Sequence, residues 1–333
     1  MAARFSSAIL TPMTDPGMKC SRCKEPARHR FRQHNARFCD PCLEIFFLRQ
    51  VEKAIEKYAM LTPGQRVLVA VSGGKDSLAL WQALIKLGYQ AEGLHLKLEL
   101  GDFSGVSLDS SREMARRLGS PLHVFALSDL AGCTVEEAAR ANRRQFCSVC
   151  GTLKRYYLNR LALELGAPAV ATGHHLDDET GRLLGNLIHG HAHHLERQWP
   201  VLAEGPGLAR KVKPLCRLGA DEIRAYAKAH DLPVAQGSCR HSKGATLPYY
   251  QEAMRLLEQK MPGTKLDFYL GFLRAKAGPP AADAPDGVCV VCGAPTHVEV
   301  CGACRLVRRA FERRQRLAEE AAAAAAAGDE AQA

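Results

Sequence analysis

Cysteines in closely spaced pairs are the residues of this sequence with the clearest capacity for chemistry. The chain contains 13 cysteines, and chance at this frequency would give about half a Cys-x-x-Cys pair. Five such pairs occur: Cys20/Cys23, Cys39/Cys42, Cys147/Cys150, Cys289/Cys292 and Cys301/Cys304. A disulfide framework does not suit a long chain with enough apolar residues for a full core. The pairs therefore predict metal binding or redox chemistry.

Four of the five pairs fall into two groups near the ends of the chain. Fifteen residues separate Cys20/Cys23 from Cys39/Cys42, and eight separate Cys289/Cys292 from Cys301/Cys304. Two close pairs at such separations can supply four thiolates to one tetrahedral zinc ion. Such small units have little core of their own, so the metal would supply much of their folding energy. We expect two zinc ribbons, each holding one Zn²⁺.

A glycine-rich turn at residues 72–77, Ser-Gly-Gly-Lys-Asp-Ser, is the second chemical feature. Its two glycines let the backbone approach a phosphate, and a following helix adds free N–H groups and a positive dipole end. Ser72, Lys75 and Ser77 add further donors. The turn is not the Walker type, because GxxxxGK[ST] is absent. An isolated Gly-Gly would indicate only a generic turn, but this hexapeptide between a strand and a helix favours nucleotide binding.

The elements that must position these residues alternate between apolar strands and helices. Helix-length crossovers between short apolar runs predict a parallel α/β sheet covered on both faces. The expected strands are residues 67–71, 93–98, 122–126 and 169–172, with helices near 107–118, 134–146 and 151–165. A helix at 43–60 precedes them, and after residue 240 the pattern is mostly helical, at 249–260 and 266–276.

The composition limits the class of protein. The 333 residues are 47% hydrophobic and 24% charged, which excludes a largely disordered or collagen-like chain. No apolar run approaches the ~20 residues of a membrane span, and residues 1–18 contain Asp15 and two prolines, unlike a secretory signal. We expect a cytoplasmic protein with no membrane partner. The net charge of +10 is compatible with a polyanionic partner.

Several motifs together resemble one known family. The turn resembles the PP-loop of the N-type ATP pyrophosphatase superfamily, and the remaining motifs resemble the TtuA-type group of tRNA 2-thiouridine synthetases, from about Cys20 to Arg308. Besides the two four-cysteine units, the matching segments are residues 147–155 (CSVCGTLKR), 173–179 (GHHLDDE), 213–215 (KPL), 262–265 (PGTK) and 292–296 (CGAPT). The resemblance implies an α/β PP-loop (adenine nucleotide α hydrolase-like) fold flanked by the two zinc ribbons.

The resemblance also implies an activity and its partners. Members adenylate C2 of a tRNA uridine with ATP and Mg²⁺, and sulfur then replaces the oxygen. Uridines 54 and 34 of tRNA are both used within the family. Sulfur often arrives from a ubiquitin-like carrier with a C-terminal thiocarboxylate, and relatives are commonly homodimers. The resemblance implies ATP contacts at Val71, Ser72, Gly73, Gly74, Lys75, Ser77, His95, Gly173 and His174.

A third group of cysteines follows from the resemblance. The family places Cys147, Cys150 and the distant Cys239 around a [4Fe–4S] cluster, whose fourth iron stays open for a sulfur ligand. We expect Lys154 and Arg155 to lower the thiol pKa values there. A persulfide or disulfide mechanism with the same cysteines is the rival interpretation.

Carboxylates and one lysine are the candidates for the adenylation chemistry. Asp76 and Asp178 are our candidates for binding Mg²⁺ or for acid–base work, with Asp177 as the next choice. Lys154 could reach the α-phosphate or the substrate. Both Asp177 and Asp178 follow the fourth expected strand, where ligands bind in such sheets. Capping of a helix N-terminus is the structural alternative for both.

Some segments depart from the family or lack an assigned role. Gly181-Arg182 stands where we expect small or polar residues, and the next loop contains His189, His191, His193 and His194. We interpret that loop as solvated. Six arginines at 305–316 could bind tRNA phosphates or form a solvated helix face, and the alanines at 321–327 indicate a fraying helix.

The motifs divide the chain and leave two other functions open. The expected units are an N-terminal ribbon at 1–45, a catalytic domain at 46–240, a helical extension at 241–280, a second ribbon at 281–310 and a tail at 311–333. One alternative is another PP-loop ligase, forming lysidine or an amide, which gives the three distant cysteines no role. The other is a non-catalytic zinc-ribbon RNA-binding protein, whose tRNA binding would not depend on Asp76 or Lys154.

Overall fold

A sheet of six strands forms the centre of the structure. The structure is a computed structural model, and it describes residues 18–237, 239–241, 245–276, 278–279, 285 and 287–330. The strand order is β5-β4-β3-β6-β8-β7, and only β7 runs antiparallel to its neighbour. The strands are β3 (Arg66–Ala70), β4 (Gln90–Lys97), β5 (Leu122–Ala126), β6 (Val170–Thr172), β7 (Val201–Leu202) and β8 (Lys211–Val212). The predicted α/β fold with a mostly parallel sheet is confirmed.

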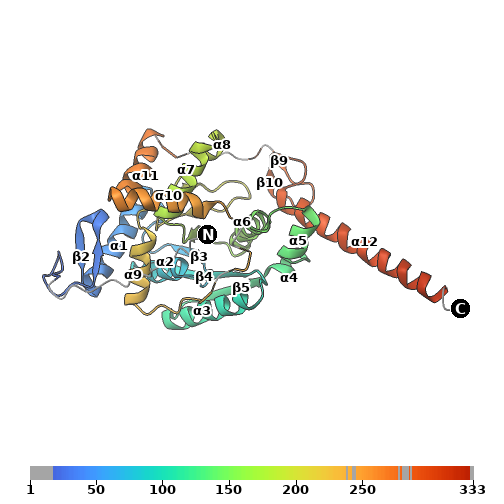
Figure 1. The fold of residues 1–333 in the computed structure, drawn as a ribbon, viewed down its shortest axis with the longest axis horizontal. Coiled ribbons are helices and arrows are strands. Elements are labelled where there is room, and N and C mark those ends of the chain that lie inside the picture. The colour runs from blue at the N-terminus through green and yellow to red at the C-terminus, as the bar shows by residue number, and fades with distance from the viewer. Residues whose placement is uncertain are drawn as a thin grey trace, which may run out of the picture.

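Helices cover this sheet and extend the fold beyond it (Figure 1). They are α1 (Asp40–Lys57), α2 (Lys75–Lys86), α3 (Asp102–Leu118), α4 (Leu127–Ala131), α5 (Val135–Asn142), α6 (Phe146–Glu164), α7 (Leu176–Ile188), α8 (Ala192–Glu196), α9 (Ala220–Ala229), α10 (Leu247–Lys260), α11 (Thr264–Ala275) and α12 (Gly302–Glu330). The four expected strands are present as β3 to β6. The sequence analysis missed β7 and β8, because strands of only two residues are too short to show a recognisable pattern of apolar residues.

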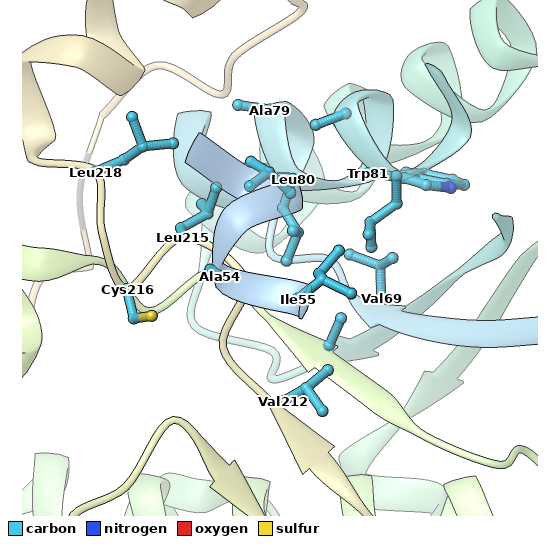
Figure 2. Packing of buried hydrophobic residues seen from close by; sticks show 14 of the residues in the cluster. Ala54, Ile55, Val69, Ala79, Leu80, Trp81, Val212, Leu215, Cys216 and Leu218 are labelled. Carbon is cyan, nitrogen blue, oxygen red and sulfur yellow. The ribbon is translucent and has the colours of Figure 1, made fainter. Parts of the chain in front are cut away.

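The main core lies between the sheet and helices α1, α2 and α9. Figure 2 shows Ala54 and Ile55 of α1 close to Val69 of β3 and Leu80 of α2. Trp81 is fully buried, and its indole N–H donates to the carbonyl of Ala91 at 3.0 Å. This core fixes α2, whose first turn carries Asp76, relative to β3.

Helix α7 packs closely against α10 because two glycines face the crossing. A Cβ atom on Gly181 would lie 2.9 Å from Cγ of Gln251, and one on Gly185 would lie 3.0 Å from Cε2 of Tyr250. Larger side chains would push the helices apart. The close approach of α7 to α10 explains why residue 181 is a glycine, a position at which the sequence analysis had noted a departure from the family.

The first four-cysteine unit is a small ribbon that continues directly into α1. Strands β1 (His29–Phe31) and β2 (Ala36–Phe38) pair antiparallel, and a 3₁₀ turn (Arg32–His34) joins them. The ribbon contacts α9, where His34 Nε2 lies 2.8 Å from a carboxylate oxygen of the buried Glu222. The predicted boundary at 45/46 falls inside α1, so helix and ribbon form one continuous segment.

The second four-cysteine unit lies at the opposite end of the molecule (Figure 1). Strands β9 (Gly287–Val288) and β10 (Pro295–Thr296) pair antiparallel, and α12 begins at the last cysteine pair. The predicted boundary at 310/311 lies within α12, which packs on α5 and α6 and then projects away from the body. The arginine and alanine segments are therefore parts of one helix.

Candidate functional site

The glycine-rich turn leads from β3 into α2 in a conformation that requires glycine. Gly73 has φ of 72°, and a Cβ atom there would lie 2.4 Å from the carbonyl oxygen of Ser107 on α3. The N–H of Ser72 donates to Oγ of Ser77 at 3.1 Å, and that hydroxyl donates to the carbonyl of Gly74 at 3.0 Å. The turn is thus held by its own serines and by close contact with α3.

Gly173, at the end of β6, approaches the same turn from the neighbouring strand. A Cβ atom on Gly173 would lie 3.0 Å from the backbone nitrogen of Ser77. Adjacent parallel strands therefore present both glycine-containing loops at one edge of the sheet, the carboxyl edge at which such folds bind ligands.

A cavity of about 260 Å³ opens beside the turn. It brings together six residues predicted from the sequence: Ser72, His95, Cys147, Cys150, Lys154 and Cys239. Its other walls come largely from Leu96 of β4, from Leu98 and Leu100 just after that strand, and from α3. The phosphate-type turn and the three distant cysteines therefore share one cavity.

Two different segments position the three thiols. Cys147 and Cys150 stand almost one turn apart at the start of α6, which places them on the same side of that helix. Cys239 comes from the segment after α9, and the N–H of Ala235 in that segment donates to the carbonyl of Gly73 at 2.9 Å. The segment bearing the third thiol is thereby tied to the glycine-rich turn.

The environment of Cys150 differs from what we expected. Burial raises the pKa of the Cys150 thiol, and the neighbouring thiols of Cys239 and Cys147 add to this, while Lys154 and Arg155 act in the opposite direction. The prediction of a lowered thiol pKa was wrong for Cys150, because burial and the neighbouring thiols outweigh the effect of the two cations. Ionisation of this thiol at neutral pH therefore calls for a bound cation.

The three thiols line one cavity but are less closely grouped than the cysteines of the ribbon units. Among the described residues, the sulfurs of each ribbon unit all lie within 4.8 Å of one another, and these three thiols do not form such a set. Three thiolates that share a cavity are a donor set that an iron–sulfur cluster could use.

Two of the predicted catalytic residues converge on a histidine that the sequence analysis did not select. His175 Nε2 lies 3.6 Å from Asp76 Oδ1 and 3.5 Å from Asp178 Oδ2. Burial raises the pKa of Asp178 and the negative charge of Asp76 raises it further, although His175 opposes the shift. Two carboxylates brought this close favour a cation between them, as Mg²⁺ would supply.

Asp177 and Asp178 have different structural roles. Asp177 accepts the N–H of Ala220 at the start of α9 at 2.9 Å and contacts Nζ of Lys265 at 2.5 Å. Asp178 accepts the N–H of His175 at 3.1 Å, at the start of its own helix. The capping alternative therefore describes both residues, but Asp178 alone of the two also faces Asp76.

A buried ion pair supports the loop that follows β6. Glu179 is fully buried, and its carboxylate accepts from Nζ of Lys213 at 2.9 Å and from the hydroxyl of Tyr269 at 3.3 Å. Burial, aided by the charge of Lys213, lowers the pKa of His174 to about 3. His174 is neutral at physiological pH and is held at 2.9 Å from Oγ1 of Thr172.

His95 occupies the wall of the cavity on β4. Its side chain is buried, and Nδ1 lies 3.0 Å from Oγ of Ser111. Burial lowers the pKa of His95 to about 4, so the ring is neutral near pH 7. A neutral imidazole can contact a nucleotide by stacking or hydrogen bonding, but it does not add positive charge.

The two ribbon units bring their cysteines together as expected. All four sulfurs of each unit lie within 4.8 Å of one another. Burial alone would raise the pKa of Cys20, but backbone N–H groups of its knuckle lower it to about 6, and the same effect lowers the pKa of Cys289 to about 6. Burial raises the pKa of other thiols in the two units, among them Cys42 and Cys301, so without a metal the thiolate is not stabilised at every cysteine of a unit. Four sulfurs so close together are the donor set that Zn²⁺ or iron prefers.

We expect about two equivalents of zinc per chain, one for each four-cysteine unit. Elemental analysis of protein purified without added metal measures this directly. A Cys289→Ser variant should lose about one equivalent and keep the other, because the two units are far apart in the fold. Folded protein without zinc would contradict the assignment.

Other predicted features lie away from the cavity. On α12, Arg314 donates to the carbonyl of Gly132 at 3.0 Å and pairs with Glu137 at 3.2 Å, so part of the arginine segment makes intramolecular contacts. His189 Nε2 lies 2.7 Å from the hydroxyl of Tyr250, and His193 belongs to the short helix α8.

Sequence reasoning also missed the walls of the cavity. Phe103, Ser104 and Ser107 of α3 line it, as does Phe146 at the start of α6. Phe146 directly precedes the Cys-x-x-Cys pair, which is the only local signal that could have indicated it. The α3 residues carry no motif, because their role arises from contact with a distant turn.

Comparisons with known proteins agree with this arrangement. The PP-loop domain family matches residues 45–240. The chain is 43% identical over 310 residues to the tRNA-5-methyluridine(54) 2-sulfurtransferase of Thermus thermophilus, covering 91% of this chain and 96% of that protein. It is 38% identical to the enzyme of the same name from Thermotoga maritima, over 90% and 98% of the two chains.

A solved structure supports the fold. The U34-tRNA thiolase NcsA from Methanococcus maripaludis, solved with its [4Fe–4S] cluster, aligns with a TM-score of 0.75 at 23% identity. The alignment covers 87% of this chain and 96% of that protein. In the described part of the chain, no helix has the length and apolar character of a membrane span.

Proposed function

This chain belongs to the PP-loop family and, within it, to the tRNA 2-sulfurtransferases, and on that premise we propose that it replaces the C2 oxygen of a tRNA uridine with sulfur in an ATP-dependent reaction. The observation that carries the proposal is the shared cavity. Ser72 of the phosphate-type turn and the thiols of Cys147, Cys150 and Cys239 line the same 260 Å³ space. Activation and sulfur delivery can therefore occur at one substrate carbon.

The first step is adenylation of the uridine. The C2 oxygen attacks the α-phosphorus of ATP, the bond to pyrophosphate breaks, and an O-adenylated uridine and pyrophosphate result. The turn at 72–77 offers N–H groups and hydroxyls to the phosphates, and Asp76 with Asp178 would hold Mg²⁺ against them. Lys154 lines the cavity, and we propose that it offsets charge at the α-phosphate.

The second step replaces AMP by sulfur. A sulfur nucleophile attacks C2, and the C2–O bond to AMP breaks, which leaves 2-thiouridine. Cys147, Cys150 and Cys239 would hold a [4Fe–4S] cluster, which when bound presents sulfur at an iron without a cysteine ligand. The apolar residues of the cavity wall exclude water, which would otherwise hydrolyse the adenylate.

The names of the relatives support a proposal for the target uridine. Both sulfurtransferases named above act, by their names, on 5-methyluridine 54. We propose the same target for this chain, in the cytoplasm. A sulfur-carrier protein with a C-terminal thiocarboxylate and a homodimeric state stay predictions.

The alternative functions make different use of the cavity. A lysidine- or amide-forming ligase has no need for three thiols beside the turn, and a non-catalytic RNA-binding protein has no need for the converging pair Asp76 and Asp178. Both features are present together. The arrangement therefore favours thiolation over either alternative.

The test is nucleoside analysis of tRNA by mass spectrometry, comparing cells that lack this gene with the parent strain. We expect 2-thio-5-methyluridine at position 54 to disappear and to return with the wild-type chain, but not with Asp178→Asn. Loss of a thio-nucleoside at position 34 instead would overturn the target assignment. An unchanged set of thio-nucleosides would overturn the proposed function.

A further inference from the structure

A second cavity, of about 330 Å³, lies where α5 meets α6. Its lining includes Arg140, Arg143 and Arg144 together with Glu136, Phe146 and His241. We call it the arginine hollow. It takes no part in the adenylation or sulfur-transfer chemistry described above, and three guanidinium groups around one cavity suggest a ligand with negative charge.

The backbone brings the arginines together at one point. Helix α5 ends at Asn142, and Arg143 follows it in the left-handed conformation with φ of 50°. The N–H of Arg143 still bonds to the carbonyl of Arg140, at 3.3 Å. The chain therefore reverses tightly at Arg143, so that the last turn of α5 and the approach to α6 place their arginines around the same hollow.

These positive charges are mostly not neutralised within the protein. The carboxylate of Glu136 is shared by Arg240 and by His241, whose Nε2 lies 3.0 Å away. Arg144 donates to the hydroxyl of Ser148 at 3.1 Å. Among the described residues, neither Arg140 nor Arg143 has a carboxylate within ion-pair distance. Neighbouring like charges are unfavourable unless an anion joins them.

One pair of aromatic rings separates the arginine hollow from the cavity of about 260 Å³ beside the glycine-rich turn, which we call the reaction cavity. Phe146 lines both cavities, and its ring stacks on His241 with centroids 3.8 Å apart and an interplanar angle of 16°. Cys147, the next residue, donates to the carbonyl of His241 at 3.3 Å. A ligand held in the arginine hollow is therefore next to the Phe146–His241 pair, and the three thiols lie on the other side of that pair.

We propose that the arginine hollow binds phosphodiester groups of the tRNA next to the target uridine, so that this nucleotide can enter the reaction cavity. The proposal rests on the proposed function for its substrate. Guanidinium groups bind phosphate in a bidentate manner that lysine cannot reproduce. The Phe146–His241 pair adds an aromatic surface of the kind that unstacked bases of RNA use, which favours RNA over an acidic protein segment.

The test removes two charges and measures tRNA binding. In Arg140→Gln/Arg143→Gln, the glutamines keep length and helix propensity while losing the phosphate contacts. We expect the dissociation constant for unmodified tRNA to rise about tenfold or more at 0.1 M salt, and the slope of log K against log salt to fall by about 1 to 2. ATP affinity and iron content should not change.

The control removes two charges on the other side of the fold. Arg49 and Lys53 are exposed on α1, one turn apart, and neither forms an ion pair with another described residue. Arg49→Gln/Lys53→Gln should lower tRNA affinity by less than about threefold, which measures the effect of net charge alone.

Two results would overturn the proposal: unchanged tRNA binding in the hollow variant, and an equal loss of tRNA affinity in the control variant. If tRNA binding is unchanged but affinity for a thiocarboxylate carrier protein is lost, the hollow is assigned to a protein partner instead. Binding is measured without ATP or a sulfur donor, so this test can succeed or fail independently of whether the chain thiolates tRNA.

Discussion

Replacing Cys239 with alanine is expected to reduce tRNA thiolation by at least about a thousandfold while tRNA-dependent release of pyrophosphate continues. Cys239 lines the reaction cavity, and its segment is tied to the glycine-rich turn through Ala235 and Gly73. The variant removes a sulfur that would hold the proposed cluster but leaves the phosphate-type turn and the carboxylates unchanged. Cys147→Ala and Cys150→Ala should behave in the same way.

Two measurements separate loss of sulfur transfer from loss of folding. Anaerobically purified wild-type protein should show the broad visible absorbance of an iron–sulfur cluster, and the three variants should lose it. Cys216→Ala is the control, because Cys216 is a fully buried cysteine that belongs to the main core and not to the reaction cavity (Figure 2). It should keep the absorbance and the activity. A Cys239→Ala protein that thiolates at the wild-type rate would exclude the cluster mechanism.

Replacing Gly73 with alanine should weaken ATP binding by at least about a hundredfold, a loss of about 2.7 kcal/mol. The new Cβ would lie 2.4 Å from the carbonyl oxygen of Ser107, so either the turn or α3 must move. The positive φ adds a cost of about 1–2 kcal/mol for a side chain. Because the same turn would supply the N–H groups that contact phosphate, this displacement should act directly on nucleotide binding.

Gly88→Ala provides the control for backbone strain alone. Gly88 also has a positive φ, of 83°, but a Cβ there meets nothing within 4 Å. Both variants should lose a similar conformational contribution to stability, seen as a lower Tm, whereas ATP affinity measured by titration calorimetry should fall only for Gly73→Ala. Equal ATP affinities in the two variants would refute the role that we assign to the turn.

Local patterns were enough to predict the elements that carry the site. The apolar run before Ser72 and the helix after Lys75 are adjacent in sequence, so strand, turn and helix could be recognised together. The spacing within each four-cysteine unit has the same local character. The cavity shared by Ser72 and Cys239 was predicted through family resemblance, since nothing local relates two residues so far apart.

Properties that depend on burial or on distant contacts were predicted less well. The pKa of Cys150 was expected to fall because Lys154 is near in sequence, but burial of the thiol determines its direction. His175 was overlooked beside His174, although it is His175 that lies between Asp76 and Asp178. The contact of Ser107 with Gly73 has no sequence signal, because either residue alone is ordinary.

The second four-cysteine unit touches the same helix that carries Cys147 and Cys150. Tyr156 and Tyr157 of α6 line a space of about 380 Å³ together with Cys292 and Cys304. If that unit holds zinc, loss of the ion through zinc shortage or oxidation would loosen its packing against α6 and disturb the alignment of Cys147 and Cys150. The supply of modified tRNA would then follow the metal status of the cell, without damage to any residue that touches the nucleotide.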